Sequence, residues 1–364
     1  MGFKCGIIGL PNVGKSTLFN ALTRSSIEAE NYPFCTIEPH VGIVAVPDIR
    51  LQKLANIVKP EKIIPAHMEF VDIAGLVAGA SKGEGLGNKF LANIRETHAL
   101  IQVVRCFEDE NIVHVSGKID PISDIEIINT ELCLADLETI SNALEKANKL
   151  NRSGIKNIKE KIETLETLII HLNKNLPIRT MNTSILDNST IKELHLLTEK
   201  PILYIANIEE NGFSSNPWLE KLRVFLEKDN SHLIPICAKI ESEVSELDNE
   251  DEKSEFLEAL GMKEPGLNRV IKSGYQLLGL QNYFTAGPKE VRAWTISIGE
   301  TAPKAAGIIH TDFERGFIRA EVTSYSDYIE YNGELGAKDA GKCRSEGKDY
   351  IVNDGDVILF RFNV

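Results

Sequence analysis

Short apolar runs rich in β-branched residues recur through residues 1–129 and return after residue 200. Longer amphipathic segments separate them. This alternation predicts an α/β fold in which helices cover both faces of a mostly parallel sheet. The predicted strands cover residues 4–8, 41–46, 68–73, 99–107, 201–206 and 232–237. We therefore expect one α/β domain, made of residues 1–129 and 201–279, with an insertion between the two parts.

Residues 130–200 carry a different pattern, in which apolar positions alternate between three and four residues apart. The first series is Leu137, Ile140, Leu144 and Ala147, and the second is Ile155, Ile158, Ile162, Leu165, Ile169 and Leu172. Residues 151–154 (N-R-S-G) lie between the two series and suit a chain reversal. The spacing predicts a helical hairpin packed as a short antiparallel coiled coil. Two ordinary core helices would give the same spacing.

The last segment, residues 280–364, is richer in short strands and turns. Its predicted strands cover residues 291–297, 317–322 and 357–362, and residues 353–356 (N-D-G-D) form a strong turn signal. We expect a small β-rich domain that is large enough to fold alone.

Composition narrows the class of protein. The 364 residues are 43% hydrophobic, which excludes chain-wide disorder, and no apolar run reaches the length of about 18 residues needed to span a membrane. The N-terminus lacks the order of charged, apolar and cleavage regions found in signal peptides. None of the six cysteines is spaced as a metal knuckle or redox pair. We expect a cytoplasmic protein with no membrane partner.

A phosphate-binding motif follows the first predicted strand. Residues 9–16 (G-L-P-N-V-G-K-S) fit G-x-x-x-x-G-K-[ST] and open a helix expected to start near Lys15, which is the context that supports a P-loop. Lys15 would reach the β- and γ-phosphates, and Ser16 would ligate Mg²⁺. Backbone N–H groups would surround the phosphate oxygens. These groups belong to Asn12, Val13, Gly14, Lys15, Ser16 and Thr17.

A second motif, D-x-x-G, begins at the end of the strand predicted over residues 68–73. Asp72 would hold Mg²⁺, and the Gly75 N–H would sense the γ-phosphate. Thr36 lies between the two motifs and is the candidate switch threonine that closes on Mg²⁺, although an ordinary loop threonine would look the same. Leu76 stands where many GTPases carry a water-orienting glutamine, so we expect slow hydrolysis or help from another group.

Together these motifs resemble a known family. The P-loop form G-x-P-N-V-G-K-S is similar to that of the Obg-related translation-factor GTPases. Residues 72–77 (D-I-A-G-L-V), 83–90 (G-E-G-L-G-N-K-F), 124–132 (D-I-E-I-I-N-T-E-L) and 284–291 (F-T-A-G-P-K-E-V) narrow the resemblance to the YchF / Obg-like ATPase family. It implies a P-loop NTPase G domain, a helical coiled-coil insertion over residues 130–200, a C-terminal β-grasp (TGS) domain and nucleotide-dependent ribosome binding.

The resemblance also implies how the base is read. GTPases of this class bind guanine with N-K-x-D, but residues 207–210 here read N-I-E-E and resemble the family's N-x-x-E. The lysine is absent and the carboxylate of Glu210 is longer. A carboxylate facing the N1 acceptor of adenine would be repelled. We therefore expect recognition to shift toward ATP.

Two further segments complete the expected base site. Asn207 would donate to N7 and accept from the 6-amino group, and the Ile208 backbone would contact the same edge. Cys237, Ala238 and Lys239 stand where relatives carry S-A-K, with the Lys239 stem packed on the base. From the residues alone, Asn207 and Glu210 would instead be interpreted as a polar strand end.

Two residues are candidates for assisting hydrolysis. His114 could reach the attacking water as a base or donor, although a lone loop histidine is also common on surfaces. Asn12 resembles the asparagine with which related P-loops hold a monovalent cation, so we expect K⁺ to stimulate hydrolysis by adding charge near the β- and γ-phosphates.

The distribution of charge bears on the expected partner. The net charge of −13 argues against a DNA partner, but residues 201–280, with 8 basic and 15 acidic residues, carry −7 of it. Residues 145–161, at the predicted hairpin tip, carry a net charge of +4. The basic residues there are Lys146, Lys149, Arg152, Lys156, Lys159 and Lys161. This tip suits contact with rRNA phosphates or is simply a solvated hairpin end.

The sequence therefore predicts an ATPase that slowly hydrolyses ATP to ADP and phosphate with Mg²⁺ and binds ribosomal RNA and protein. Two alternatives remain: an Obg-type GTPase, and a non-catalytic nucleotide-sensing ribosome adaptor, which the leucine at position 76 would suit.

Overall fold

The structure, a computed structural model, describes residues 3–24, 40–73, 86–109, 118–152, 158–229, 231–247 and 249–363. The chain divides into two compact units. Residues 1–43 and 69–270 form unit 1, and residues 44–68 and 271–364 form unit 2. Part of the predicted first domain segment, residues 44–68, thus belongs with the C-terminal unit. Every helix within the described ranges is too short or too polar to span a bilayer.

The sheet of unit 1 has the strand order β2-β4-β1-β5-β6-β7. Its strands are β1 (Lys4–Ile8), β2 (Val41–Ala45), β4 (His67–Asp72), β5 (Ala99–Cys106), β6 (Ile202–Ile208) and β7 (His232–Ile236). β1 pairs in parallel with β4 on one side and β5 on the other, and β5–β6 and β6–β7 are also parallel. The predicted parallel α/β sheet is confirmed, and its strand order changes direction around β1, where such folds bind ligands.

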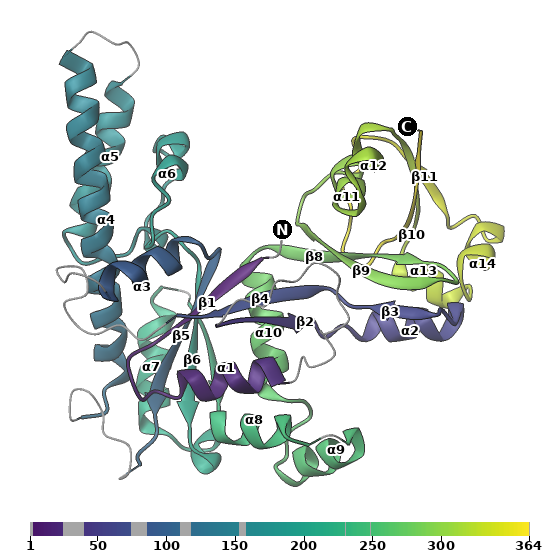
Figure 1. The fold of residues 1–364 in the computed structure, drawn as a ribbon, viewed down its shortest axis with the longest axis horizontal. Coiled ribbons are helices and arrows are strands. Elements are labelled where there is room, and N and C mark those ends of the chain that lie inside the picture. Colours follow the sequence, from purple (N-terminus) through teal and green to yellow (C-terminus); the bar gives the residue numbers. More distant parts are fainter. Residues whose placement is uncertain are drawn as a thin grey trace. The chain divides into compact units, whose positions relative to one another are not determined.

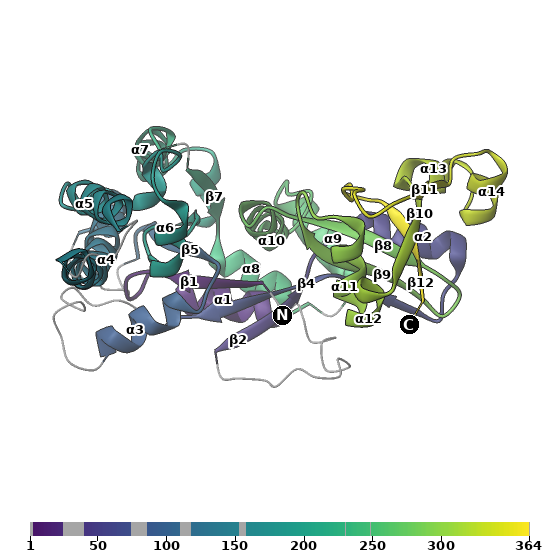
Figure 2. The same cartoon turned by 90° about the horizontal axis from the view of Figure 1, so that it is seen from above.

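Helices cover both faces of this sheet. α1 (Lys15–Arg24) contacts α8 (Ala238–Ser245) on one face, and α4 (Pro121–Arg152) contacts α7 (Pro217–Glu227) on the other (Figure 2). Three further helices of the fold are α3 (Leu86–Arg95), α9 (Glu250–Ala259) and α10 (Gly266–Leu277). The β-branched strands are buried on both sides as a result, and β5 and β6 are buried at every position.

The helical hairpin is formed by α4 and α5 (Lys159–Leu172), which run side by side away from the sheet (Figure 1). Leu137, Ile140, Leu144 and Ala147 of α4 pack with Ile162, Leu165, Ile169 and Leu172 of α5 in one apolar cluster. The short elements η2 (Ile178–Thr180) and α6 (Asn188–Leu194) close its lower end. The predicted pairing is confirmed for these eight positions. Ile158 is buried at the N-cap of α5, and Ile155 lies outside the described residues.

The hairpin does not begin at the predicted boundary between residues 129 and 130. α4 is continuous from Pro121, and its first turns bury Ile125 and Ile128 against β5 of the sheet. The same helix is therefore part of the α/β core at one end and of the hairpin at the other.

Unit 2 contains a second sheet with the order β11-β10-β12-β8-β9-β3. Its strands are β3 (Lys62–Ile64), β8 (Leu280–Ala286), β9 (Glu290–Ser297), β10 (Phe317–Thr323), β11 (Arg344–Glu346) and β12 (Val357–Phe362). The β8–β9 and β10–β12 pairs are antiparallel, while β12 lies parallel to β8 at the centre. This is the expected β-grasp arrangement, and β3 extends it by pairing in parallel with β9.

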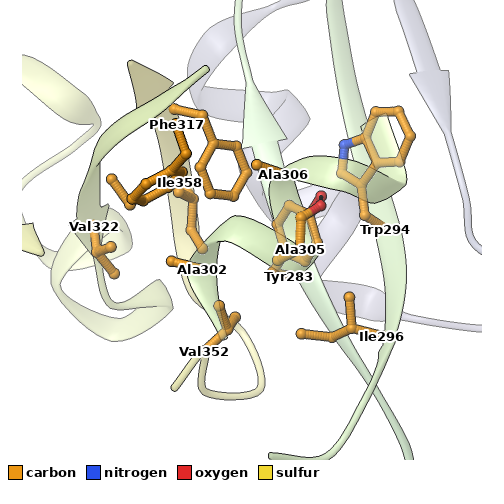
Figure 3. Close-up of a cluster of buried hydrophobic side chains, with 12 residues drawn as sticks. Tyr283, Trp294, Ile296, Ala302, Ala305, Ala306, Phe317, Val322, Val352 and Ile358 are labelled. Carbon is orange, nitrogen blue, oxygen red and sulfur yellow. Dashed lines mark hydrogen bonds between the residues drawn. The ribbon is translucent and has the colours of Figure 1, made fainter. Parts of the chain in front are cut away.

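The core of unit 2 lies between this sheet and a short helix. Ala302, Ala305 and Ala306 of α11 (Ala302–Ile309) face Tyr283 and Phe317 of the sheet (Figure 3). The Tyr283 hydroxyl donates to the Ala305 carbonyl at 2.8 Å. Three more helices make this unit less β-rich than its sequence predicts. They are α12 (Thr311–Arg315), α13 (Tyr325–Glu330) and α14 (Glu334–Asp339).

A partly buried ion cluster joins the two parts of unit 2. Arg50, at the start of α2 (Ile49–Val58), donates to Asp48 at 2.8 Å and to Asp354 at 2.8 Å. Its guanidinium also lies 5.2 Å from the Phe284 ring centre. The Arg50 guanidinium lowers the pKa of Asp48 despite the burial of that carboxyl. Residues 44–68 are thereby tied to the C-terminal part of the same unit.

Candidate functional site

A cleft of about 1210 Å³ opens in unit 1 where the predicted motifs converge. Its walls come from the loop after β1, the end of β4, and the loops after β5, β6 and β7. The lining residues are Leu10, Pro11, Asn12, Gly14, Lys15, Ser16, Thr17, Asp72, Phe107, Glu108, Asp109, Asn207, Ile208, Glu209, Glu210, Asn211, Cys237, Ala238, Lys239, Ser242 and Glu243. The carboxyl ends of parallel strands meet at one sheet edge, which is why segments far apart along the chain form one site.

The loop between β1 and α1 is the expected P-loop. Asn12 and Gly14 both have positive φ angles, of 65° and 94°. A Cβ at Gly14 would lie 2.1 Å from Nδ2 of Asn207, and a Cβ at Gly9 would lie 2.8 Å from the Val103 carbonyl oxygen. Glycine is therefore required at both positions by close packing. The Val13 side chain is buried, so only its backbone can serve the cleft.

Lys15 and Asp72 meet in the cleft. The Lys15 ammonium donates to the Asp72 carboxylate, and both side chains are largely buried. Ser16, at the start of α1, is exposed in the same cleft. One hydroxyl and one carboxylate are a donor set that suits Mg²⁺, which takes one or two protein ligands and completes its shell with phosphate oxygens and water.

Asn207 is held by the protein at both ends of its amide. Its Nδ2 donates to the Val13 carbonyl at 2.9 Å, and its Oδ1 accepts from the Ala238 N–H at 3.0 Å. The side chain is buried. It therefore ties the P-loop to the loop after β7, a role that sequence reasoning did not assign to it.

The other base-site candidates lie at the outer end of the cleft. The Lys239 ammonium donates to Glu210 Oε1 at 3.0 Å, and this hydrogen bond raises the pKa of Lys239. Cys237 is buried in an apolar cluster with Ile240 and Val244, and burial raises the pKa of its thiol. The cysteine at the position of the relatives' serine is thus part of the packing beneath α8.

Nine lining residues were not predicted from the sequence, and three of them, Phe107, Glu108 and Asp109, form a run directly after β5. Phe107 is the one aromatic side chain in the described lining. The signal available was their position after an apolar strand of a parallel sheet, where functional side chains gather.

Three predicted site residues, Thr36, Gly75 and His114, lie outside the described residues, as does Leu76. Their roles stay predictions. Within the described ranges no cluster of three or more His, Cys, Asp or Glu side chains suits a metal ion, so a metal here would rely on phosphate oxygens as well as on Ser16 and Asp72.

Family models match two regions of the chain. The model described as a 50S ribosome-binding GTPase matches residues 4–136. A second model, for the C-terminal region of YchF GTPases and described as a protein of unknown function, matches residues 280–363.

Several relatives match the chain over its full length. The protein named ribosome-binding ATPase YchF from Haemophilus influenzae is 62% identical over 364 residues, covering all of both chains. The proteins of that name from Escherichia coli O157:H7 and Bacillus subtilis are 59% and 55% identical, again over the full length of both chains. The solved YchF GTPase of Schizosaccharomyces pombe matches with a TM-score of 0.90 at 39% identity, covering 99% of this chain and 98% of that one.

Proposed function

Because this chain belongs to the YchF family, we propose that its unit 1 cleft binds and slowly hydrolyses ATP and that its nucleotide state controls binding to ribosomes. The observation that carries the proposal is the convergence of Lys15, Ser16 and Asp72 with the N-x-x-E loop in one cleft. The names of its relatives support the ribosome as partner, and with that partner we expect a cytoplasmic protein.

The phosphate end of the cleft performs the chemistry. The backbone N–H groups of residues 12–17 and the Lys15 ammonium hold the β- and γ-phosphates. Mg²⁺ held by Ser16 and Asp72 would neutralise charge on the same phosphate oxygens. Water attacks the γ-phosphorus and the bond to the β–γ bridging oxygen breaks, which gives ADP and inorganic phosphate. Gly75 would contact the γ-phosphate and Thr36 the metal ion, and His114 would orient the water.

The Lys15–Asp72 ion pair has a part in this scheme. In the structure the Lys15 ammonium and the Asp72 carboxylate form an ion pair inside the cleft. With nucleotide and Mg²⁺ present, Lys15 would pair with phosphate oxygens and Asp72 with the metal ion, and each would be a better partner than the other side chain. Binding therefore exchanges one ion pair for two charge-assisted contacts, so nucleotide and metal affinities should depend on each other.

The base end of the cleft supports a preference for ATP. The Oε1 atom of Glu210 accepts from Lys239, so a guanine that used this carboxylate would compete with the ion pair. Phe107 offers a ring face on which a base can stack. The Ile208 backbone and the remaining hydrogen-bonding capacity of the Asn207 amide can then address the adenine edge.

Competition binding tests this assignment. ATP and GTP are titrated against a fluorescent nucleotide on the purified full chain, with Lys15→Ala as the non-binding control. We expect ATP to bind at least about tenfold more tightly, which corresponds to about 1.4 kcal/mol. A tenfold preference for GTP would instead support an Obg-type GTPase. Single-turnover assays with and without ribosomes separate an ATPase from a non-catalytic adaptor, because an adaptor gives no product in either.

We further propose that Asn12 helps to hold K⁺ beside the β- and γ-phosphates. Asn12 lines the cleft, and its positive φ presents the side chain from a tight turn. A cation there would add to the charge of Lys15 in the transition state. Hydrolysis is compared in KCl and NaCl at equal ionic strength, for the natural chain and for Asn12→Ala. Equal rates in the two salts would rule the proposal out.

A further inference from the structure

The side chain of Arg105 is the largest among the fully buried ones in the described ranges, at 1% exposure on β5. A guanidinium stays charged at any ordinary pH, and burying that charge is costly unless its donors are satisfied. A buried arginine at the carboxyl end of a central strand is therefore expected to have defined partners and a defined purpose.

Two hydrogen-bond partners of Arg105 lie in the wall of the cleft. Its Nε donates to the Phe107 carbonyl at 3.0 Å, and its Nη2 donates to the Asp109 carbonyl at 3.3 Å. The guanidinium carbon also lies 4.5 Å from the centre of the Phe107 ring. One side chain thus holds both ends of the 107–109 segment and the ring at its start.

Hydrogen bonds of the adjacent residues also hold the carboxyl ends of β5 and β6 in place. Arg105 pairs with Asn207 in the register of β5 and β6, and Asn207 ties the P-loop to the loop after β7. The Cys106 carbonyl accepts from Nδ2 of Asn216, the N-cap of α7. Arg105 itself does not line the cleft, whereas the three residues that follow Cys106 do.

We propose that Arg105 is a positioning residue that sets nucleotide affinity by holding Phe107 and the backbone of residues 107–109 against the bound nucleotide. This inference rests on the proposed function of the cleft. A planar guanidinium can donate in its plane to two carbonyls while its face packs on a ring. A lysine ammonium in the same place offers a point charge without that geometry.

The variant that tests the proposal is Arg105→Lys, which keeps the buried charge and removes the planar fork. We expect the Kd for ATP to rise about tenfold, because even a small displacement of this wall moves it away from the ligand. The single-turnover rate at saturating ATP should change less than twofold, since the P-loop and Asp72 are untouched. A purely structural role would lower the single-turnover rate as well as raise the Kd.

Matched variants separate the mechanism from general damage to β5. Gln102 lies on the same strand as Arg105 and is equally buried, and neither of its amide atoms has a hydrogen-bond partner in the described structure. Gln102→Leu is therefore the control variant. It should leave the Kd unchanged. Phe107→Leu should raise the Kd by about as much as Arg105→Lys. The double variant should raise the Kd little further, because both single changes remove the same contact of Phe107 with the nucleotide.

The outcomes are distinct. An unchanged Kd in Arg105→Lys, or a loss confined to the hydrolysis rate, would overturn the inference. If Arg105→Lys does not fold by circular dichroism, Phe107→Leu decides alone, and an unchanged Kd there overturns it equally. If the natural chain binds neither ATP nor GTP, the proposed function of the cleft fails instead.

Discussion

Gly14 shows how tightly single residues are constrained in the cleft. Its φ of +94° is unfavourable for any side chain, and a Cβ there would collide with the Asn207 amide. We expect Gly14→Ala to weaken ATP binding by at least about tenfold, or about 1.4 kcal/mol, because the P-loop must shift to relieve the clash, and to lower the stability of the fold. Nucleotide titration measures the change in the Kd for ATP, and urea unfolding measures the change in the free energy of unfolding.

Gly261→Ala is the matched control for this change. Gly261 also has a positive φ, of 69°, but nothing lies within 4 Å of the position that a Cβ would take there. It should lose only about 1–2 kcal/mol of stability for the left-handed conformation and keep its ATP affinity. Equal losses of ATP affinity in the two variants would mean that the clash with Asn207 is not what excludes alanine at position 14.

His67 gives a prediction for pH. Burial and then the nearby Arg292 charge lower the pKa of His67 to about 4. The unfolded chain takes up this proton near pH 6.5, whereas the folded chain does not until about pH 4. Stability from this group is therefore present above pH 6.5 and lost as the pH falls toward 4, by on the order of 3 kcal/mol.

Urea unfolding between pH 4 and 7 checks this expectation against His67→Gln. The variant should lose less stability than the natural chain over that interval, while the exposed His232→Gln should not differ from the natural chain. Parallel pH curves for the natural chain and His67→Gln would contradict it.

At the scale of elements, the α4–α5 hairpin depends on its seam. Leu165 is fully buried between the helices, whereas Ile170 on the same helix is 61% exposed. We expect Leu165→Ala to cost about 2–5 kcal/mol and Ile170→Ala less than about 1 kcal/mol. Urea unfolding followed by helical circular dichroism measures both, and equal losses would argue against a packed hairpin.

The elements that sequence predicts best are those whose pattern is local. β1 and β12 have the predicted ends, and the other predicted strands differ by one or two residues at one or both ends. The acidic stretch after Lys239 contains α8 and α9. Within it, buried Glu241 accepts from the N–H groups of Gly266 and Leu267. These partners come from the start of another helix, so composition alone could not indicate them.

Long-range contacts explain what was missed in both fold and site. β3 covers only Lys62–Ile64 and pairs with β9, which belongs to the C-terminal part of the chain. No periodicity marks so short a strand or its partner. Likewise the P-loop could be recognised because its residues are contiguous, whereas the hydrogen bonds from Asn207 to Val13 and Ala238 exist only after β1, β6 and β7 are aligned.

At the scale of the whole molecule, the chain is acidic, so we expect it to contact RNA through a locally basic surface at the tip of the hairpin. Lys146, Arg152 and Lys159 are exposed at the described ends of the hairpin helices. Changing all three to Gln should weaken ribosome co-sedimentation and lower the slope of log Kd against log salt by about one for each phosphate that is no longer neutralised. Exposed Lys53, Lys221 and Lys228 changed to Gln are the control, and equally weakened binding in both sets would contradict a role for the tip.

The division of unit 2 into residues 44–68 and 271–364 has a consequence for synthesis. The first piece leaves the ribosome early, and its partner follows only after about 200 more residues, roughly 10–40 s later at about 5–20 residues per second. During that interval α2 has no sheet to cover, and the apolar side chains of Leu51 and Leu54, buried in the finished unit, stay exposed. The nascent chain would therefore expose an apolar helix face until the strands of unit 2 have been synthesised. The order of translation determines when the core of unit 2 can pack.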